Sequence, residues 1–139
     1  MQQKWPVGIL LGAYGFLHLF GFFTSWDVIE TSAISRTPTV LPDELPVGVL
    51  RDLGALWLLG AIAFWISGYA VIQDKHWWKG VTFGSAILSM VVTIFWVHEA
   101  WPGLILNLLI IVLVVGSWRH NGHNQHLPSA FNQTSSNPE

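Results

Sequence analysis

Residues 103–118 read GLILNLLIIVLVVGSW, and between 104 and 115 the one polar residue is Asn107. A helix on the surface of a water-soluble protein needs a polar outer face, which this stretch lacks. Three further apolar stretches accompany it, at residues 7–26, 47–72 and 80–97. Each is close to the roughly 20 residues that a helix needs to cross about 30 Å of hydrocarbon. The sequence therefore predicts an all-α integral membrane protein, an up-down-up-down bundle of four helices within residues 1–118.

The composition also favours lipid as the solvent. Of the 139 residues, 52% are hydrophobic and 10% are charged, and the mean hydropathy is +0.49. The chain has no cysteine, which excludes disulfides, thiolate nucleophiles and cysteine-held metal centres. The net charge of −2 and the lack of a run of Lys or Arg argue against nucleic acid as a partner. The bilayer itself is the expected partner.

Tryptophan and lysine positions predict where the membrane ends and how the chain is oriented, because Trp gathers at membrane boundaries and cations on the cytoplasmic side. Seven of the nine Trp residues fall at predicted helix ends: Trp5, Trp26, Trp77, Trp78, Trp96, Trp101 and Trp118. One side of the bundle carries four cations, Lys4, Lys75, Lys79 and Arg119. The loop 27–46 on the other side holds the single cation Arg36 among four acidic residues. Both termini are therefore predicted to be cytoplasmic.

Two segments outside the helices are distinctive. The loop 27–46 is long for a compact bundle and could cover a site. Residues 119–139 are polar and without periodicity, so this tail is predicted to be disordered. Three histidines in it recur at a spacing of three, at His120, His123 and His126. They could bind a transition metal weakly, but a solvated tail is the expected state.

Small and polar residues mark the helix faces that are expected to contact protein rather than lipid. On helix 7–26 these are Gly8, Gly12 and Gly15, with His18 at their flank. On helix 80–97 we expect two inward faces, which would make it the central helix. One runs through Gly80, Gly84, Ile87, Val91 and Ile94 to His98, and the other through Ser85, Ser89 and Thr93. Helix 103–118 has a sparse inward stripe, Gly103, Asn107, Val114 and Ser117, and is expected to be peripheral.

The strongly polar intramembrane residues all fall in the outer half of the predicted bundle. Because a charge in hydrocarbon costs at least about 2.5–3.5 kcal/mol, such a cluster is a candidate functional site. Its candidate ligand-binding residues are His18, Arg51, Asp52, Trp57, His98, Glu99 and Asn107. In the alternative, purely structural interpretation, Arg51 snorkels to the surface, His18 bonds across helices and Asn107 caps a neighbour.

The functional interpretation is an amphipathic pocket that opens toward the outer face. Aromatic residues expected in its wall are Trp57, Trp65, Phe16 and Phe20. Such a pocket suits a lipid-like or quinone-like molecule, which makes a quinone the candidate cofactor. No metal site is predicted, because His18, His98 and Glu99 lack the spacing that puts two ligands on one helix face.

Several short motifs resemble one family. These are Gly12, Gly15 and Gly21 in the first helix, DLGALWLLG at 52–60, the segment Met90–His98, and Asn107-Leu108-Leu109. Together, over roughly residues 7–118, they are similar to the DoxX-like small membrane proteins. The resemblance implies a four-helix protein of the bacterial or archaeal plasma membrane, in a group with members thought to be accessory subunits of membrane redox systems. The chain lacks that family's glycine-rich closing motif and has a longer first loop, and no catalytic residue can be transferred to it.

The leading functional prediction is an accessory subunit or a binder of an amphipathic small molecule, rather than an enzyme. It would act through the polar cluster, with a membrane protein or a second copy as candidate partner. One alternative is a component of a quinone-linked membrane oxidoreductase, in which His18 or His98 handles protons. Another is a dimeric small transporter, although the apolar inner half of the bundle argues against a polar path through the membrane.

Overall fold

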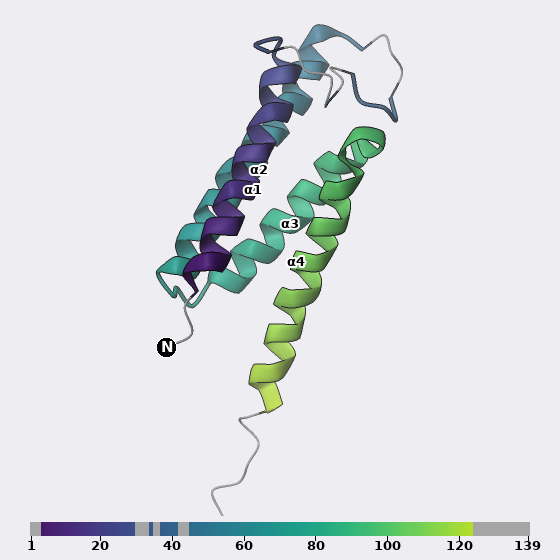
Figure 1. Cartoon of the computed structure of the whole chain (residues 1–139). Coiled ribbons are helices and arrows are strands. Elements are labelled where there is room, and N and C mark those ends of the chain that lie inside the picture. The colour runs from purple at the N-terminus through teal and green to yellow at the C-terminus, as the bar shows by residue number, and fades with distance from the viewer. Residues whose placement is uncertain (1–3, 30–33, 35–36, 42–44, 124–139) are drawn as a thin grey trace, which may run out of the picture.

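The computed structural model describes residues 4–29, 34, 37–41 and 45–123. It contains four helices: α1 (Trp5–Ser25), α2 (Val47–Ile72), α3 (Trp78–Phe95) and α4 (Val97–His123). All four are long and apolar enough to cross a membrane, so the chain is a multi-pass membrane protein. The helices alternate in direction, and the start of α1 and the end of α4 lie at the same end of the molecule (Figure 1). The predicted all-α four-helix bundle is confirmed.

The helix bounds differ most from expectation at the C-terminal end. The predicted span 47–72 coincides with α2, whereas α4 begins at Val97 rather than at residue 103. α4 is interrupted at Ala100, whose φ of −103° and ψ of 15° are not helical, so that Pro102 lies in the first turn of the long helix that follows. The helix then continues to His123, and the rest of the tail that the sequence predicts to be disordered, 124–139, lies outside the described residues.

Glycines bring the backbones of α1 and α2 into close contact. A Cβ atom added to Gly68 would lie 2.6 Å from the carbonyl oxygen of Gly8, and one added to Gly8 would lie 2.9 Å from that of Gly68. A Cβ at Gly15 would likewise lie 2.9 Å from the carbonyl oxygen of Ala61. Since only glycine permits such an approach, these contacts confirm that the glycine face of α1 is turned toward protein.

One of the two predicted inward faces of α3 is wrong. Ser85, Ser89 and Thr93 are buried as expected, but the stripe that contains Gly80 and Gly84 is exposed. A Cβ at either glycine would meet no atom within 4 Å, so no neighbour in the bundle uses the space they leave. His98, at the end of this stripe, is exposed as well, whereas His18 is 2% exposed. Of the two histidines predicted to project toward protein, only His18 does so.

The hydroxyl face of α3 can be buried because most of its hydroxyl groups donate a hydrogen bond to a backbone carbonyl of their own helix. Thr82 donates to the carbonyl of Trp78 at 2.8 Å, and Thr93 donates to that of Ser89 at 2.6 Å. A hydroxyl bonded to the carbonyl four residues back needs no partner from a neighbouring helix. This face then packs in the bundle interior, and α3 lies against both α2 and α4 as predicted for the central helix.

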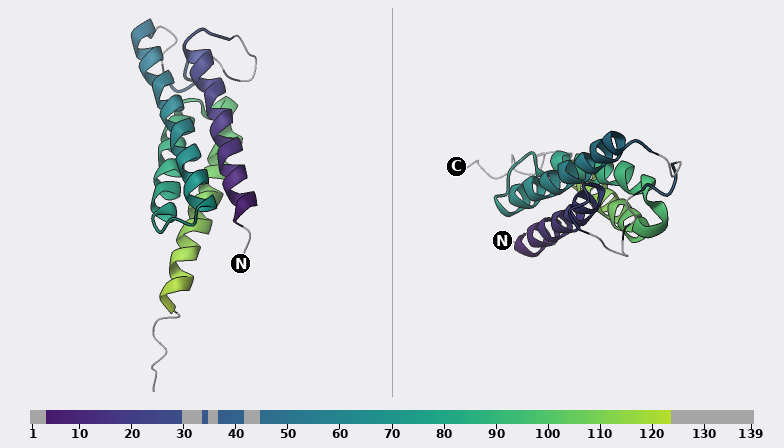
Figure 2. Two further views of the ribbon diagram at one scale, coloured as in Figure 1. Left: turned by 90° about the vertical axis from the view of Figure 1, so that its left-hand side faces the viewer. Right: turned by 90° about the horizontal axis from the view of Figure 1, so that it is seen from above.

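α4 is the peripheral helix, as its sequence predicts. Asn107 and Val114 form its buried stripe, while Leu108, Leu109 and Val112 are each more than half exposed. Its last turns extend beyond the ends of the other helices (Figure 2). The Cα atoms of α1 and α4 come no closer than 8 Å within the described ranges, so these two helices meet through side chains alone.

Candidate ligand pocket

A cavity of about 250 Å³, called here the outer pocket, lies between α1, α2, α3 and the start of α4, at the end of the bundle that carries the first loop. Its lining residues are Tyr14, Leu17, His18, Ile34, Trp57, Thr93, Glu99, Ala100, Pro102 and Gly103. Three of the seven predicted site residues, His18, Trp57 and Glu99, are among them. The structure therefore brings together, at one cavity, residues from three helices that are far apart in the sequence.

His18 lines the pocket, and both of its ring nitrogens are hydrogen-bonded to protein groups. Its Nδ1 lies 3.0 Å from the carbonyl oxygen of Tyr14, one turn earlier on α1. A carbonyl only accepts, so Nδ1 carries the hydrogen and donates it. Nε2 lies 2.7 Å from the hydroxyl oxygen of Ser89 on α3, and in the neutral ring this nitrogen accepts the Ser89 proton. In the neutral imidazole, each ring nitrogen thus has one hydrogen-bond partner within the protein.

Asn107 of α4 also forms a hydrogen bond to Ser89. Its Nδ2 lies 2.8 Å from the same Ser89 oxygen. Because Ser89 donates its proton to His18, its oxygen accepts from the Asn107 amide. The result is a hydrogen-bonded chain from Asn107 through Ser89 and His18 to the Tyr14 backbone, which we call the polar chain. It joins α4, α3 and α1 in the middle of the bundle.

Tyr14 makes a second link between α1 and α4. Its hydroxyl donates to the carbonyl oxygen of Gly103 at 3.2 Å. Its ring packs edge-on against His18, with the centroids 4.9 Å apart, and against Phe64 at 4.7 Å. Tyr14 is therefore a fixed part of the pocket wall, held by aromatic contacts and by one hydrogen bond.

Four predicted site residues do not line the pocket: Asn107, which the polar chain connects to its wall, and Arg51, Asp52 and His98. Arg51 is exposed, and its guanidinium carbon stands 5.8 Å from the centre of the Trp26 ring, within the range of a cation–π contact. Asp52 and His98 are also exposed and do not line the cavity. The other three aromatic residues expected in the wall, Trp65, Phe16 and Phe20, are between 36% and 59% exposed and lie elsewhere on the bundle.

Sequence reasoning missed Tyr14, Thr93 and Ser89. Tyr14 could have been found, because it precedes His18 by four residues and so shares its helix face. Thr93 and Ser89 were assigned to an inward face of α3, but nothing in their residue type connected them to a site. Ser89 is the residue that joins two predicted candidates, His18 and Asn107, into one network.

Two buried polar atoms next to this network have no hydrogen-bond partner among the described residues. They are Nε1 of Trp57 and Oδ1 of Asn107, in side chains that are 4% and 0% exposed. Leaving a buried donor or acceptor unpaired costs about 1–3 kcal/mol, and native proteins keep few of them. Trp57 lines the outer pocket, where its ring packs edge-on against His18 with the centroids 5.4 Å apart. The Trp57 N–H is thus buried beside this cavity, and an oxygen atom that reached it from the pocket would satisfy it.

The charge character of the outer pocket is neutral to acidic. In the part of the chain that the structure describes, no Lys or Arg lines it, while Glu99 does. The nitrogens of His18 are already occupied by protein groups. Among the described residues, a phosphate or carboxylate would find no cation lining this cavity, whereas a neutral carbonyl, hydroxyl or ether oxygen would not need one.

Comparisons of this chain with protein-family models, curated proteins and solved structures find no match. The resemblance to the DoxX-like proteins therefore stays a prediction that rests on the motifs alone.

Proposed function

We propose that this protein binds a neutral amphipathic small molecule, with the oxygen-bearing head group in the outer pocket. The single observation that carries the proposal is the Trp57 side chain, which lines a cavity of about 250 Å³ and whose buried N–H has no partner among the described residues. A carbonyl, hydroxyl or ether oxygen of the ligand accepts this hydrogen bond. Binding then removes the unfavourable free energy of an unpaired donor.

The access route favours a ligand that is dissolved in the membrane. Leu17 lines the pocket and is 56% exposed on the flank of a membrane-spanning helix. A molecule in the bilayer therefore reaches the cavity sideways, between α1 and α4. By the distribution of Lys and Arg, this half of the bundle lies in the outer leaflet. The resemblance to the DoxX-like proteins implies that the membrane is a bacterial or archaeal plasma membrane.

A quinone fits this description, because its ring carbonyls are neutral acceptors. An accessory role in holding such a molecule agrees better with the geometry than proton transfer does. Both ring nitrogens of His18 are hydrogen-bonded to protein groups, and His98 lies outside the pocket. Neither histidine offers an unoccupied nitrogen to a ring bound in this pocket.

The proposal is tested by asking what copurifies with the protein. The full chain is extracted from membranes in a mild detergent, and neutral lipids bound per protein are quantified by mass spectrometry. Trp57→Phe keeps an aromatic ring but removes the N–H, so bound neutral amphiphile should fall about two- to tenfold, the value of one hydrogen bond.

Trp65→Phe is the matched control. It also removes an indole N–H, but that N–H donates to the carbonyl of Gly12 at 3.2 Å, outside the outer pocket. Retention should stay at the level of the unsubstituted chain. Equal retention in the two variants, or recovery of anionic phospholipids alone, would contradict the proposal.

A further inference from the structure

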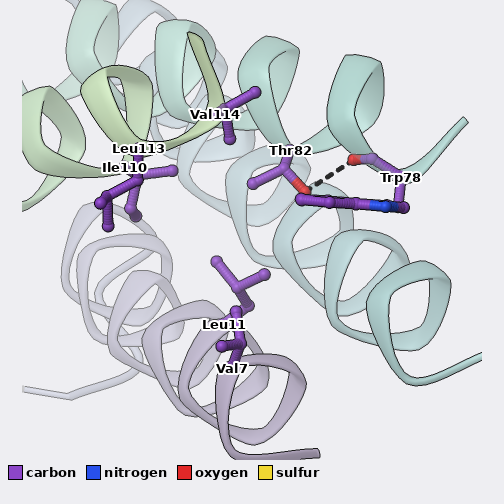
Figure 3. A pocket seen from close by; sticks show the side chains of 7 residues that line it. All are labelled: Val7, Leu11, Trp78, Thr82, Ile110, Leu113 and Val114. Carbon is purple, nitrogen blue, oxygen red and sulfur yellow. Dashed lines mark hydrogen bonds between the residues drawn. The ribbon is translucent and has the colours of Figure 1, made fainter. Parts of the chain in front are cut away.

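A second cavity, of about 240 Å³, lies between α1, α3 and α4 in the half of the bundle nearer the two termini. We call it the inner groove. Its lining residues are Val7, Leu11, Trp78, Thr82, Ile110, Leu113 and Val114. Figure 3 shows these side chains facing a common space from the three helices.

The chemistry of the inner groove is that of hydrocarbon. Its lining is aliphatic apart from the Trp78 ring and the hydroxyl of Thr82, and that hydroxyl donates to the Trp78 carbonyl at 2.8 Å (Figure 3). No lining side chain here carries a charge. The groove thus has affinity for an alkyl or isoprenoid chain and none for a polar head group.

The inner groove and the outer pocket follow each other along the same two helices. Leu11 lines the groove and Tyr14 lines the pocket, one turn apart on α1. On α4, Gly103 of the pocket and Ile110 of the groove stand on the two sides of the buried Asn107. From Val7 to His18 the combined path is about 16 Å long at 1.5 Å per residue.

Size and access both favour a single occupant. Small-molecule sites usually measure about 300–1,000 Å³, a range that neither cavity reaches alone and that the two reach together. Both also have exposed lining residues, because Val7 and Leu113 of the groove and Leu17 of the pocket are each more than half exposed. The backbones of α1 and α4 make no close contact, so a chain can lie along their junction beside the Tyr14–Gly103 hydrogen bond.

We propose that the inner groove holds the hydrocarbon tail of the molecule whose head group occupies the outer pocket. The ligand is then one neutral, long-tailed amphiphile that lies along the junction of α1 and α4, head toward the first loop and tail toward the termini. This inference rests on the proposed function, to which it adds the class and the orientation of the ligand.

Photolabelling tests the two ends of the ligand separately. The probe is hexadecanol, a neutral alcohol, carrying a diazirine either next to the hydroxyl or at the end of the tail, added to the full chain in nanodiscs. Adducts of the head-labelled probe should map to the segment around Glu99. Adducts of the tail-labelled probe should map to the first turns of α1 and to residues 110–114.

The outcomes separate the two proposals. Tail adducts spread evenly over lipid-facing residues such as Leu59 and Ile62 of α2, with head adducts still near Glu99, would overturn the inference about the groove alone. If the head adducts are spread as well, the proposed function fails together with it.

A variant that fills the groove gives an independent measurement. Val7 is 51% exposed, so Val7→Trp can be accommodated and places its ring against the groove. Competition of unlabelled hexadecanol with the head-labelled probe should weaken about tenfold, because part of the tail loses its apolar contact, whereas octanol should compete as before. Ile9→Trp, on a residue that is 60% exposed and lines neither cavity, should leave both alcohols unchanged.

Unchanged competition by hexadecanol in Val7→Trp would overturn the tail assignment. Failure of both alcohols to compete with the head-labelled probe in the unsubstituted chain would instead remove the proposed function.

Discussion

Ser89 holds the centre of the bundle together through a single hydroxyl group. Its proton goes to His18 and its oxygen accepts from Asn107, so it is used as donor and acceptor at the same time. All three side chains are at most 2% exposed. In such surroundings no water replaces a lost partner, and each of the three depends on the other two.

Ser89→Ala is expected to lower the free energy of unfolding by about 1–3 kcal/mol, because it leaves Nε2 of His18 and the Asn107 amide unpaired. The measurement is an equilibrium unfolding titration in detergent. Ser25→Ala is the control, since the Ser25 hydroxyl donates only to the Gly21 carbonyl of its own helix and its loss should change stability by less than about 0.5 kcal/mol. Equal losses in the two variants would show that the polar chain does not stabilise the bundle.

The sequence identified the polar ends of this chain but not its middle. Histidine and asparagine are rare inside membrane helices, so His18 and Asn107 could be picked out one by one. Ser89 could not, because α3 carries several hydroxyls and most of them bond their own backbone. Which of them meets a neighbour depends on the relative rotation of three helices, and a single sequence does not contain that information.

At the level of helices, small residues do two different things in this protein. On α1 and α2 they let backbones touch, as at Gly8 and Gly68. On α3 the glycines face outward and the buried face consists of hydroxyl residues. The rule that small residues mark helix contacts predicted the glycine face of α1 correctly and that of α3 wrongly. It does not distinguish a glycine that a neighbouring helix contacts from one that no other helix contacts.

Gly68→Ala is expected to destabilise the fold by about 1–3 kcal/mol, because the new methyl group meets the Gly8 carbonyl and rigid backbone has to move. Gly84→Ala, with no atom within 4 Å of the new Cβ, should instead stabilise α3 by about 0.5–1 kcal/mol through its higher helix propensity. Thermal unfolding in detergent compares the two variants. A stabilised Gly68→Ala protein would mean that α1 and α2 are not packed as described.

At the level of the whole molecule, α1–α2 and α3–α4 are two hairpins joined by the packing of α2 against α3. Composition and hydropathy were enough to predict the number of helices and their alternating direction. They were not enough to place the cavities, which lie between α1 and α4, two helices whose backbones make no close contact.

The orientation of the bundle can be tested with single cysteines, because the chain has none of its own. Val28→Cys is at an exposed position beyond the end of α1, and His76→Cys is at an exposed position between α2 and α3. On intact cells, a membrane-impermeant maleimide should label Val28→Cys and should label His76→Cys only after permeabilisation, because Lys and Arg favour the cytoplasmic side. The reverse pattern would place both termini outside.

The polar chain also constrains how the protein is made. Ribosomes deliver the helices in order, so the imidazole on the first helix enters the bilayer with only its own backbone as a partner. The serine reaches it two helices later, and the asparagine arrives with the last helix. A chain interrupted before that point keeps unsatisfied groups in lipid, which gives quality-control proteases a means of telling an unfinished molecule from a finished one.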